Sequence, residues 1–271
     1  MRGASRASLA QATDQLSGVL GRARTNAGRL GDELFAVAGL LDREAGLRRT
    51  LSDPSRQANA KAELARGLLS GKVLAVTLDT VTGLVSSRWS APGDLADATE
   101  QLAALATVAQ ADSEGTLDEL EDELFRFSRI VAGEPTLRVA LSSPYVEADR
   151  KRQLLATLLD GKVTPATQRL VTQAALQPRG RSLDASLEEY AGIAARRRER
   201  LVVEVHVATD LSADQRGRLA EALRTAYGHD VHLNVVLDPQ VIGGMSVRIG
   251  DEVIDGSIAT RLAVLRRKLA A

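Results

Sequence analysis

The chain has 271 residues, of which 44% are hydrophobic, 26% charged and only 3% aromatic, and its 35 basic residues balance 35 acidic ones. This composition is typical of a soluble globular protein, and a net charge of zero with few aromatics disfavours binding to nucleic acid or to an anionic membrane. The chain contains no cysteine, which excludes disulfides, thiolate nucleophiles and cysteine-ligated zinc.

The N-terminal segment, MRGASRASLAQATDQL, is charged and lacks the apolar core of a signal peptide. Leu9, Leu16 and Leu20 indicate an amphipathic helix there. No apolar run in the chain approaches the roughly 20 residues of a membrane span. We therefore expect a soluble, cytoplasmic protein.

An internal duplication follows this segment. Residues 32–73 and 122–163 align at a constant offset of 90 without a gap, and 18 of their 42 positions are identical. A weaker match continues from GDLADATEQLA to RSLDASLEEYA, so the copies cover roughly Leu30–Ala109 and Leu120–Ala195. The second copy has no lead helix of its own, unless the segment near Leu105 serves both copies.

Both copies are predicted to consist of short helices of a bundle, each of which hides one apolar face. In the second copy, leucines at positions 154, 155, 158 and 159 form a stripe at helical spacing. We expect Pro144 in the first turn of this helix with Ser143 as its N-cap, and Gly161 at its end. A later stripe in each copy consists of Leu183, Leu187, Tyr190, Ala191 and Ala194, matched by Leu95, Leu102, Leu105 and Ala109.

The sequence GKV ends the first of these stripes in both copies and invites comparison with the phosphate loop. That motif needs four residues between its two glycines, then Lys and Ser or Thr. Here only three residues separate Gly67 from Gly71, Val73 follows Lys72, and Thr157 replaces the first glycine in the second copy. We interpret the glycine of GKV, Gly71 and its counterpart in the second copy, as a helix end.

Two charged clusters are better explained as helix surfaces than as binding or catalytic sites. The basic run at residues 196–200 is short and interrupted by a glutamate, and cations suit the C-terminal end of a helix. The four carboxylates within residues 119–123 share one helical segment, which favours a solvated or partner-binding face over general acid/base catalysis.

After residue 200 the apolar pattern changes from helical to alternating. Residues 203–207 predict a half-buried strand. Ser212 then begins a helix, with Gln215 at capping-box spacing and Gly228 at its end. Residues 231–237 alternate again and predict a second strand.

His206, His229 and His232 are the three histidines of the chain, and a metal-dependent hydrolase is one hypothesis for them. No zinc-ligand spacing fits them. His229 follows a turn glycine, and the other two occupy solvent-side strand positions. The chain also lacks the nucleophile elbow, the HExxH motif and the GxGxxG motif. We predict no catalytic residue, no cofactor and no metal ligand.

The stretch VIGGMSVRIGDEVIDGSIATRLAVLRRKL, residues 241–269, combines a strand, a turn and a helix. Residues 245–249 alternate as a strand, Gly250–Asp251 is a Gly-X turn of the II′ type, and residues 252–254 return. Residues 255–257, Asp-Gly-Ser, end the strand and cap a helix. Its apolar face contains Ile258, Leu262, Leu265 and Leu269. Every glycine here has a backbone role, and none requires a ligand.

This stretch resembles the C-terminal signature of the delta subunit of F-type ATP synthase, called the oligomycin-sensitivity-conferring protein in mitochondria. The signature is a Gly-Gly pair, an apolar strand, a Gly-Asp turn, an Asp-Gly-Ser segment and a closing helix. The chain fits it at Gly243, Gly244, Gly250, Asp251, Asp255, Gly256, Ser257, Arg261 and Leu262. The chain departs from the usual family pattern in its duplication, in which it is similar to the longer actinobacterial form.

The sequence therefore predicts a mainly α fold with a small α+β C-terminal domain and a duplicated N-terminal helical bundle. We expect three units: a first helical unit at 1–110, its duplicate at 111–195, and an α+β domain with the signature hairpin and helix at 196–271.

The resemblance implies a non-catalytic subunit of the peripheral stalk, which joins the catalytic head to the b subunit as part of the stator and supports proton-driven ATP synthesis. The helical region is expected to hold N-terminal helices of the alpha subunits, and the C-terminal domain to meet the b subunit. Neither nucleic acid nor a cofactor is expected. Membrane association comes only through the complex, at the cytoplasmic face of the cell membrane.

Six apolar residues of the second copy are candidates either for partner contact or for packing within their own domain: Leu124, Phe125, Phe127, Ile130, Leu154 and Leu158. An alternative function is a stand-alone helical adaptor whose α+β domain binds a ligand or nucleic acid. The zero net charge and few aromatics count against nucleic acid.

Overall fold

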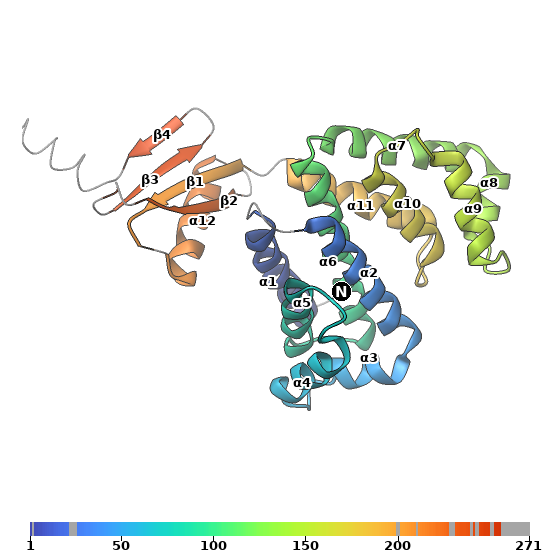
Figure 1. The fold of residues 1–271 in the computed structure, drawn as a ribbon, viewed down its shortest axis with the longest axis horizontal. Coiled ribbons are helices and arrows are strands. Elements are labelled where there is room, and N and C mark those ends of the chain that lie inside the picture. The colour runs from blue at the N-terminus through green and yellow to red at the C-terminus, as the bar shows by residue number, and fades with distance from the viewer. Residues whose placement is uncertain are drawn as a thin grey trace, which may run out of the picture. The chain divides into compact units, whose positions relative to one another are not determined.

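Helices dominate the chain, as the spacing of its apolar residues predicts (Figure 1). The computed structural model describes residues 1, 3–21, 26–198, 201–209, 211–227, 231–238, 241, 244–249 and 252–255. The chain divides into two units, Met1–Arg198 and Glu199–Ala271. Within the described ranges, no helix is both long enough and apolar enough to cross a membrane. The predicted fold class, mainly α with a small α+β C-terminal domain, is confirmed.

The first unit contains eleven described helices, and eight of them repeat. Helices α2 to α5 have the same lengths as α7 to α10 and start 90 residues earlier, so the duplication seen in the sequence is also present in the secondary structure. The bounds are α1 Gly3–Leu20, α2 Ala27–Arg43, α3 Ala45–Ser52, α4 Ala58–Leu69, α5 Ala75–Ser86, α6 Pro92–Ser113, α7 Leu117–Gly133, α8 Pro135–Ser142, α9 Ala148–Leu159, α10 Pro165–Leu176 and α11 Leu183–Arg198.

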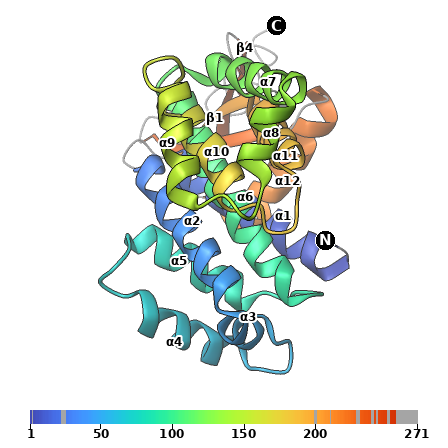
Figure 2. The same ribbon diagram turned by 90° about the vertical axis from the view of Figure 1, so that its right-hand side faces the viewer.

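Helix α6 belongs to both copies. As the closing helix of the first copy, α6 packs along α2. It also packs against α10 and α11, in the same way that the lead helix α1 packs against α5 and α6. In both views of the ribbon, α3 to α5 and α7 to α11 lie on opposite sides of α6 (Figures 1 and 2). The segment near Leu105 therefore serves as the lead helix of the second copy.

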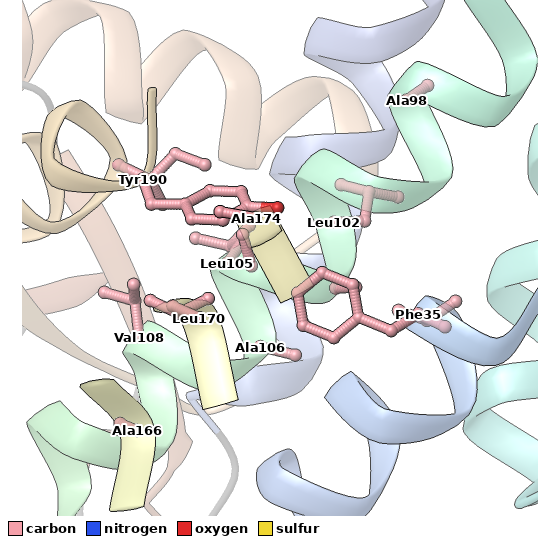
Figure 3. Close-up of a cluster of buried hydrophobic side chains, with 14 of the residues drawn as sticks. Phe35, Ala98, Leu102, Leu105, Ala106, Val108, Ala166, Leu170, Ala174 and Tyr190 are labelled. Atoms are coloured by element: carbon pink, nitrogen blue, oxygen red, sulfur yellow. The ribbon is translucent and has the colours of Figure 1, made fainter. Parts of the chain in front are cut away.

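One continuous hydrophobic core runs through both copies. Figure 3 shows Phe35 of α2 beside Leu102 and Leu105 of α6, with Leu170 of α10 and Tyr190 of α11 in the same cluster. Leu102 and Leu170 are fully buried, and burial of such a side chain contributes roughly 1.5–3 kcal/mol. The expected boundary between residues 110 and 111 falls inside α6. The division of the helical region into two units therefore remains a prediction that rests on the sequence repeat.

The glycines after the leucine stripes end their helices as predicted. Gly71 follows α4 with φ +73°, and Gly161 follows α9 with φ +66°, in the left-handed region that glycine adopts without a steric penalty. The prediction for Pro144 and Ser143 is wrong. Helix α9 begins only at Ala148, and Pro144 lies in the turn before it. Proline disfavours helical backbone in the residue before it. The extended Ser143 therefore ends α8 instead of starting α9.

The second unit is a four-stranded sheet with one described helix, in the strand order β2-β1-β3-β4. Strands β1 and β2 pair in parallel because α12 connects them, and β3 and β4 pair antiparallel. The bounds are β1 Leu201–Val207, α12 Ala213–Tyr227, β2 Val231–Leu237, β3 Met245–Ile249 and β4 Glu252–Asp255. Its core centres on Val205, Val207, Leu223 and Val247. The predicted capping box is confirmed: Ser212 N donates to Gln215 Oε1 at 2.9 Å, and Gln215 N to Ser212 Oγ at 3.2 Å.

Candidate functional site

The residues of the C-terminal signature are described in part. Gly244 has φ +80°, which favours glycine, and Asp255 is the last residue of β4. Ile249 pairs with Glu252, so two residues connect the strands, as the hairpin prediction requires. The remaining signature residues lie outside the described residues: Gly243, Gly250, Asp251, Gly256, Ser257, Arg261 and Leu262.

The histidines do not form a metal site in the part of the chain that the structure describes. His206 Nδ1 lies 3.4 Å from Asp238 Oδ2, an ion pair when the imidazole is protonated. His206 stands opposite Val236 of β2, whereas His232 lies four residues away on that strand, about 13 Å. His229 lies outside the described residues. No group of three His, Asp or Glu side chains suited to a metal occurs within those described.

Three of the four carboxylates at residues 119–123 have partners in the structure. Glu123 accepts hydrogen bonds from Thr164 N and Oγ1, both at 2.9 Å, and from Thr167 Oγ1 at 2.6 Å, which caps the first turn of α10. Glu33 caps α5 in the same way in the first copy. Burial acts to raise the pKa of Glu33, but hydrogen bonds from Thr77, Leu74 and Arg29 outweigh it and lower the pKa overall. The acidic segment is therefore a helix cap and a surface, not an acid/base pair.

A buried charged cluster joins the two copies, and the sequence did not predict it. Glu100 on α6 is fully buried. Its Oε1 accepts a hydrogen bond of 2.5 Å from the Tyr190 hydroxyl on α11. Its Oε2 lies 2.5 Å from Arg181 Nη2 and 3.0 Å from Arg179 Nη1, in the loop between α10 and α11. One first-copy carboxylate thus holds three second-copy donors.

Two further carboxylates complete this cluster. Asp97 pairs with Arg179, and Glu189 pairs with Arg181. Burial raises the pKa of Asp97 and of Glu189, although the neighbouring guanidinium groups oppose this. Burial and the negative charge of Glu100 raise the pKa of Tyr190, which keeps the phenol a neutral donor. The one sequence signal for this cluster is Glu100 itself, a charge two residues before the apolar segment LAALA of α6.

A groove of about 350 Å³ lies between α1 and α5. Ala12, Leu16 and Val19 line it from α1, and Val76 and Leu84 from α5, together with polar side chains of both helices. A methyl group added at Gly83, also in the lining, would meet no atom within 4 Å, so the groove is open there. Apolar walls and small residues suit the apolar face of a partner helix.

The six candidate contact residues of the second copy differ in their exposure. Leu124 and Phe127 are buried in the core, and Leu154 and Leu158 are half-buried against it. Phe125 and Ile130 are 62% and 54% exposed. Packing within the unit accounts for the first four, and the last two present apolar surface to solvent.

Comparison with known proteins adds a family relationship. Residues 102–269 match the family model described as ATP synthase delta (OSCP) subunit. That range begins inside α6, where the structure places the lead helix of the second copy, so most of the first copy precedes it.

Close relatives span the whole chain, and each is named ATP synthase subunit delta. The Streptomyces avermitilis protein is 48% identical over 269 residues, which covers 99% of this chain and 98% of the relative. The Thermobifida fusca protein is 48% identical over 270 residues and covers 100% of both chains. A chain of the Toxoplasma gondii mitochondrial ATP synthase hexamer matches 62% of this chain and 95% of its own length at 21% identity, with a TM-score of 0.28.

Proposed function

This chain belongs to the ATP synthase delta (OSCP) subunit family, and we propose that it joins the catalytic head of an F-type ATP synthase to the b subunit of the peripheral stalk. It is a non-catalytic subunit of a membrane-associated complex and supports ATP synthesis as part of the stator. The observation that carries this function is 48% identity over nearly the whole chain to proteins named ATP synthase subunit delta. We place the subunit at the cytoplasmic face of the membrane, held there by the complex.

The construction of the helical unit suits a part that resists torque. A stator joint has to transmit force without internal rearrangement. Here α6 runs through both copies, which share one core, and the buried Glu100 cluster ties the loop before α11 to α6. Close-packed interiors deform little under load. These features support a rigid helical block between head and stalk.

For the head we propose that an N-terminal helix of an alpha subunit binds in the groove between α1 and α5. The groove offers apolar walls with open space at Gly83, and an amphipathic helix that lays its apolar face in such a groove is a common recognition mode. For the b subunit we propose the C-terminal unit, which carries the family signature. A stand-alone adaptor would require neither partner.

The groove can be tested in the full chain with two glycine variants. Gly83→Leu places a side chain in the groove, whereas Gly67→Leu on α4 adds the same side chain at an exposed position outside the lining. Both replace a helical glycine, so neither weakens its helix. We expect Gly83→Leu to weaken binding to the isolated head at least tenfold, about 1.4 kcal/mol. Equal affinities of the two variants would refute the groove as the head site.

The C-terminal unit is tested by deletion of residues 241–271 from the subunit in assembled membranes. We expect ATP hydrolysis by the soluble head to persist, while proton pumping by the membranes is lost. Pumping at the wild-type level with the deleted chain would contradict the proposed joint. Separate pull-downs of the two helical copies would be uninformative, because a cut near residue 110 divides α6 and opens the shared core.

A further inference from the structure

We propose that the outer face of α7 binds a helix of another subunit, which presents an aromatic ring to Phe125 and an arginine to Asp122. That the partner is a subunit of the ATP synthase rests on the proposed function. Its contacts are inferred from the first copy, where the equivalent face of α2 is already covered.

The two faces begin from the same sequence. The tetrapeptide Asp-Glu-Leu-Phe occurs at residues 32–35 in α2 and at 122–125 in α7. The glutamate caps α5 in the first copy and α10 in the second, and the leucine is buried in the core in both. The aspartate and the phenylalanine therefore lie on equivalent faces of equivalent helices.

In the first copy, the second copy covers this face. Phe35 is only 7% exposed, and its ring meets Tyr190 edge-on with 6.5 Å between the centroids. Asp32 Oδ1 lies 2.5 Å from Arg169 Nε of α10. Next to this face, α2 also packs closely on α6 of its own copy, where a methyl group added at Gly31 would lie 2.8 Å from Thr107 Oγ1.

In the second copy, the same face is open among the described residues. Phe125 is 62% exposed. Asp122 pairs at 2.5 Å with Arg126 of its own helix, and both side chains are more than half exposed. Such an i,i+4 surface pair is weak, so Asp122 can exchange it for a guanidinium on a partner.

The differences between the two faces define the partner further. Asp118 and Glu121 replace the glycines that let α2 approach α6 closely. In the second copy α11 takes the place of α6 beside these two carboxylates. A partner that meets Phe125 and Asp122 therefore binds next to a run of acidic side chains on α7, which favours a basic helix. Arg198 at the end of α11 lies 3.0 Å from Glu121, so Glu121 already has a guanidinium partner and Asp122 is the carboxylate left for the partner helix. Aromatic and arginine side chains are also the residues that carry most binding energy in interfaces.

Binding of the full-length chain to ATP synthase stripped of its own copy of this subunit tests the inference. Phe125→Ala removes the exposed ring, and Tyr145→Ala is the matched control, because Tyr145 is a 94% exposed aromatic in the turn before α9. We expect at least a tenfold loss of affinity for Phe125→Ala and less than twofold for Tyr145→Ala. Asp122→Lys is expected to weaken binding similarly. Wild-type affinity in both Phe125→Ala and Asp122→Lys would overturn the inference.

A cysteine reporter identifies what covers the face, since the chain has no cysteine of its own. Arg129→Cys places a thiol on the exposed surface one turn after Phe125. We expect fast alkylation in the free chain and at least tenfold slower alkylation in the complex. Slow alkylation in the free chain would mean that residues 199–271 or a second copy covers α7, and would overturn the inference. A wild-type chain that fails to rejoin the complex would overturn the proposed function, whereas one that rejoins with this thiol still reactive would overturn only the α7 site.

Discussion

Replacement of Glu100 by glutamine tests whether the buried charged cluster holds the two helical copies together. The substitution keeps the shape of the side chain and removes its charge. Three donors lose their carboxylate: the Tyr190 hydroxyl, Arg181 and Arg179. The glutamine oxygen can still accept from one of them, but its amide hydrogens then face a guanidinium.

The expected cost follows from the burial of the partners. Removal of one member of a buried ion pair costs about 3–5 kcal/mol, because the other charge is left uncompensated. Arg181 keeps Glu189 and is 24% exposed, and Arg179 keeps Asp97, so part of the charge remains balanced. We therefore expect the lower end, about 3 kcal/mol, or roughly a hundredfold in the unfolding equilibrium.

Urea unfolding of the full chain measures this cost. Trp89 is the single tryptophan, is 5% exposed and donates to the Leu84 carbonyl at 2.8 Å, so its fluorescence reports on the first copy. Circular dichroism reports on all helices. Tyr190→Phe keeps the charges and removes one hydrogen bond to a carboxylate, at about 1.5–3 kcal/mol. Glu63→Gln, at an exposed pair with Arg66, is expected to change stability by less than about 0.5 kcal/mol.

Two results would refute this reasoning. If Glu100→Gln lowers the urea midpoint no more than Glu63→Gln does, the cluster contributes nothing to stability. If the Trp89 signal and the helical signal of the wild-type chain change at different urea concentrations, the copies do not unfold as one unit.

The remaining predictions concern single positions in the helical unit. Glu33→Gln should cost about 1 kcal/mol at neutral pH through the weakened α5 cap. The pKa of Glu33 lies below its ordinary 4.5, so its contribution is present above pH 4.5 and is lost as the pH falls through the folded pKa. Urea unfolding at several pH values should show the difference from wild type vanish in acid. Gly31→Ala should cost about 1–3 kcal/mol, because its methyl group would also lie 3.2 Å from the Ala103 carbonyl. Gly28→Ala should cost less, because it meets only the movable end of Gln110; a larger shift in melting temperature for Gly28→Ala would contradict this. Lys61→Met should leave stability at neutral pH equal or higher, because burial lowers the pKa of Lys61 and its charge opposes folding there. The stability of the wild-type chain should rise with pH between that lowered pKa and 10.5, whereas the stability of Lys61→Met should not. A clear loss of stability of Lys61→Met at neutral pH would show that the contact of Lys61 with the Ser87 carbonyl outweighs burial.

Local sequence was sufficient wherever a structure depends on neighbouring residues. The left-handed glycines after α4 and α9 and the Ser212–Gln215 capping box follow from residues within a few positions of one another. Among the described residues, the apolar periods predicted helices and strands in the correct order, and the repeat at an offset of 90 predicted the paired helices; the predicted closing helix from Ile258 lies outside them. The error at Pro144 also has a local cause, because a proline near a helix can stand before or within its first turn.

Contacts between distant segments could be decided only by tertiary structure. Glu100 and Arg181 are 81 residues apart in the chain, and no spacing rule relates a helix interior to a remote loop. The dual role of α6 likewise depends on how the second copy packs, which the sequence left as an alternative.

The repeated Asp-Glu-Leu-Phe segment separates these two contributions most clearly. Its four residues determine the same local structure in both copies: a helix, a capping glutamate and a buried leucine. Yet Phe35 is buried and Phe125 is exposed. The exposure of a side chain on the outer face of a helix depends on what packs against that face. The sequence by itself thus determined the helix and its inner face, and only the tertiary structure decided which outer face is covered within the molecule and which is open to a partner.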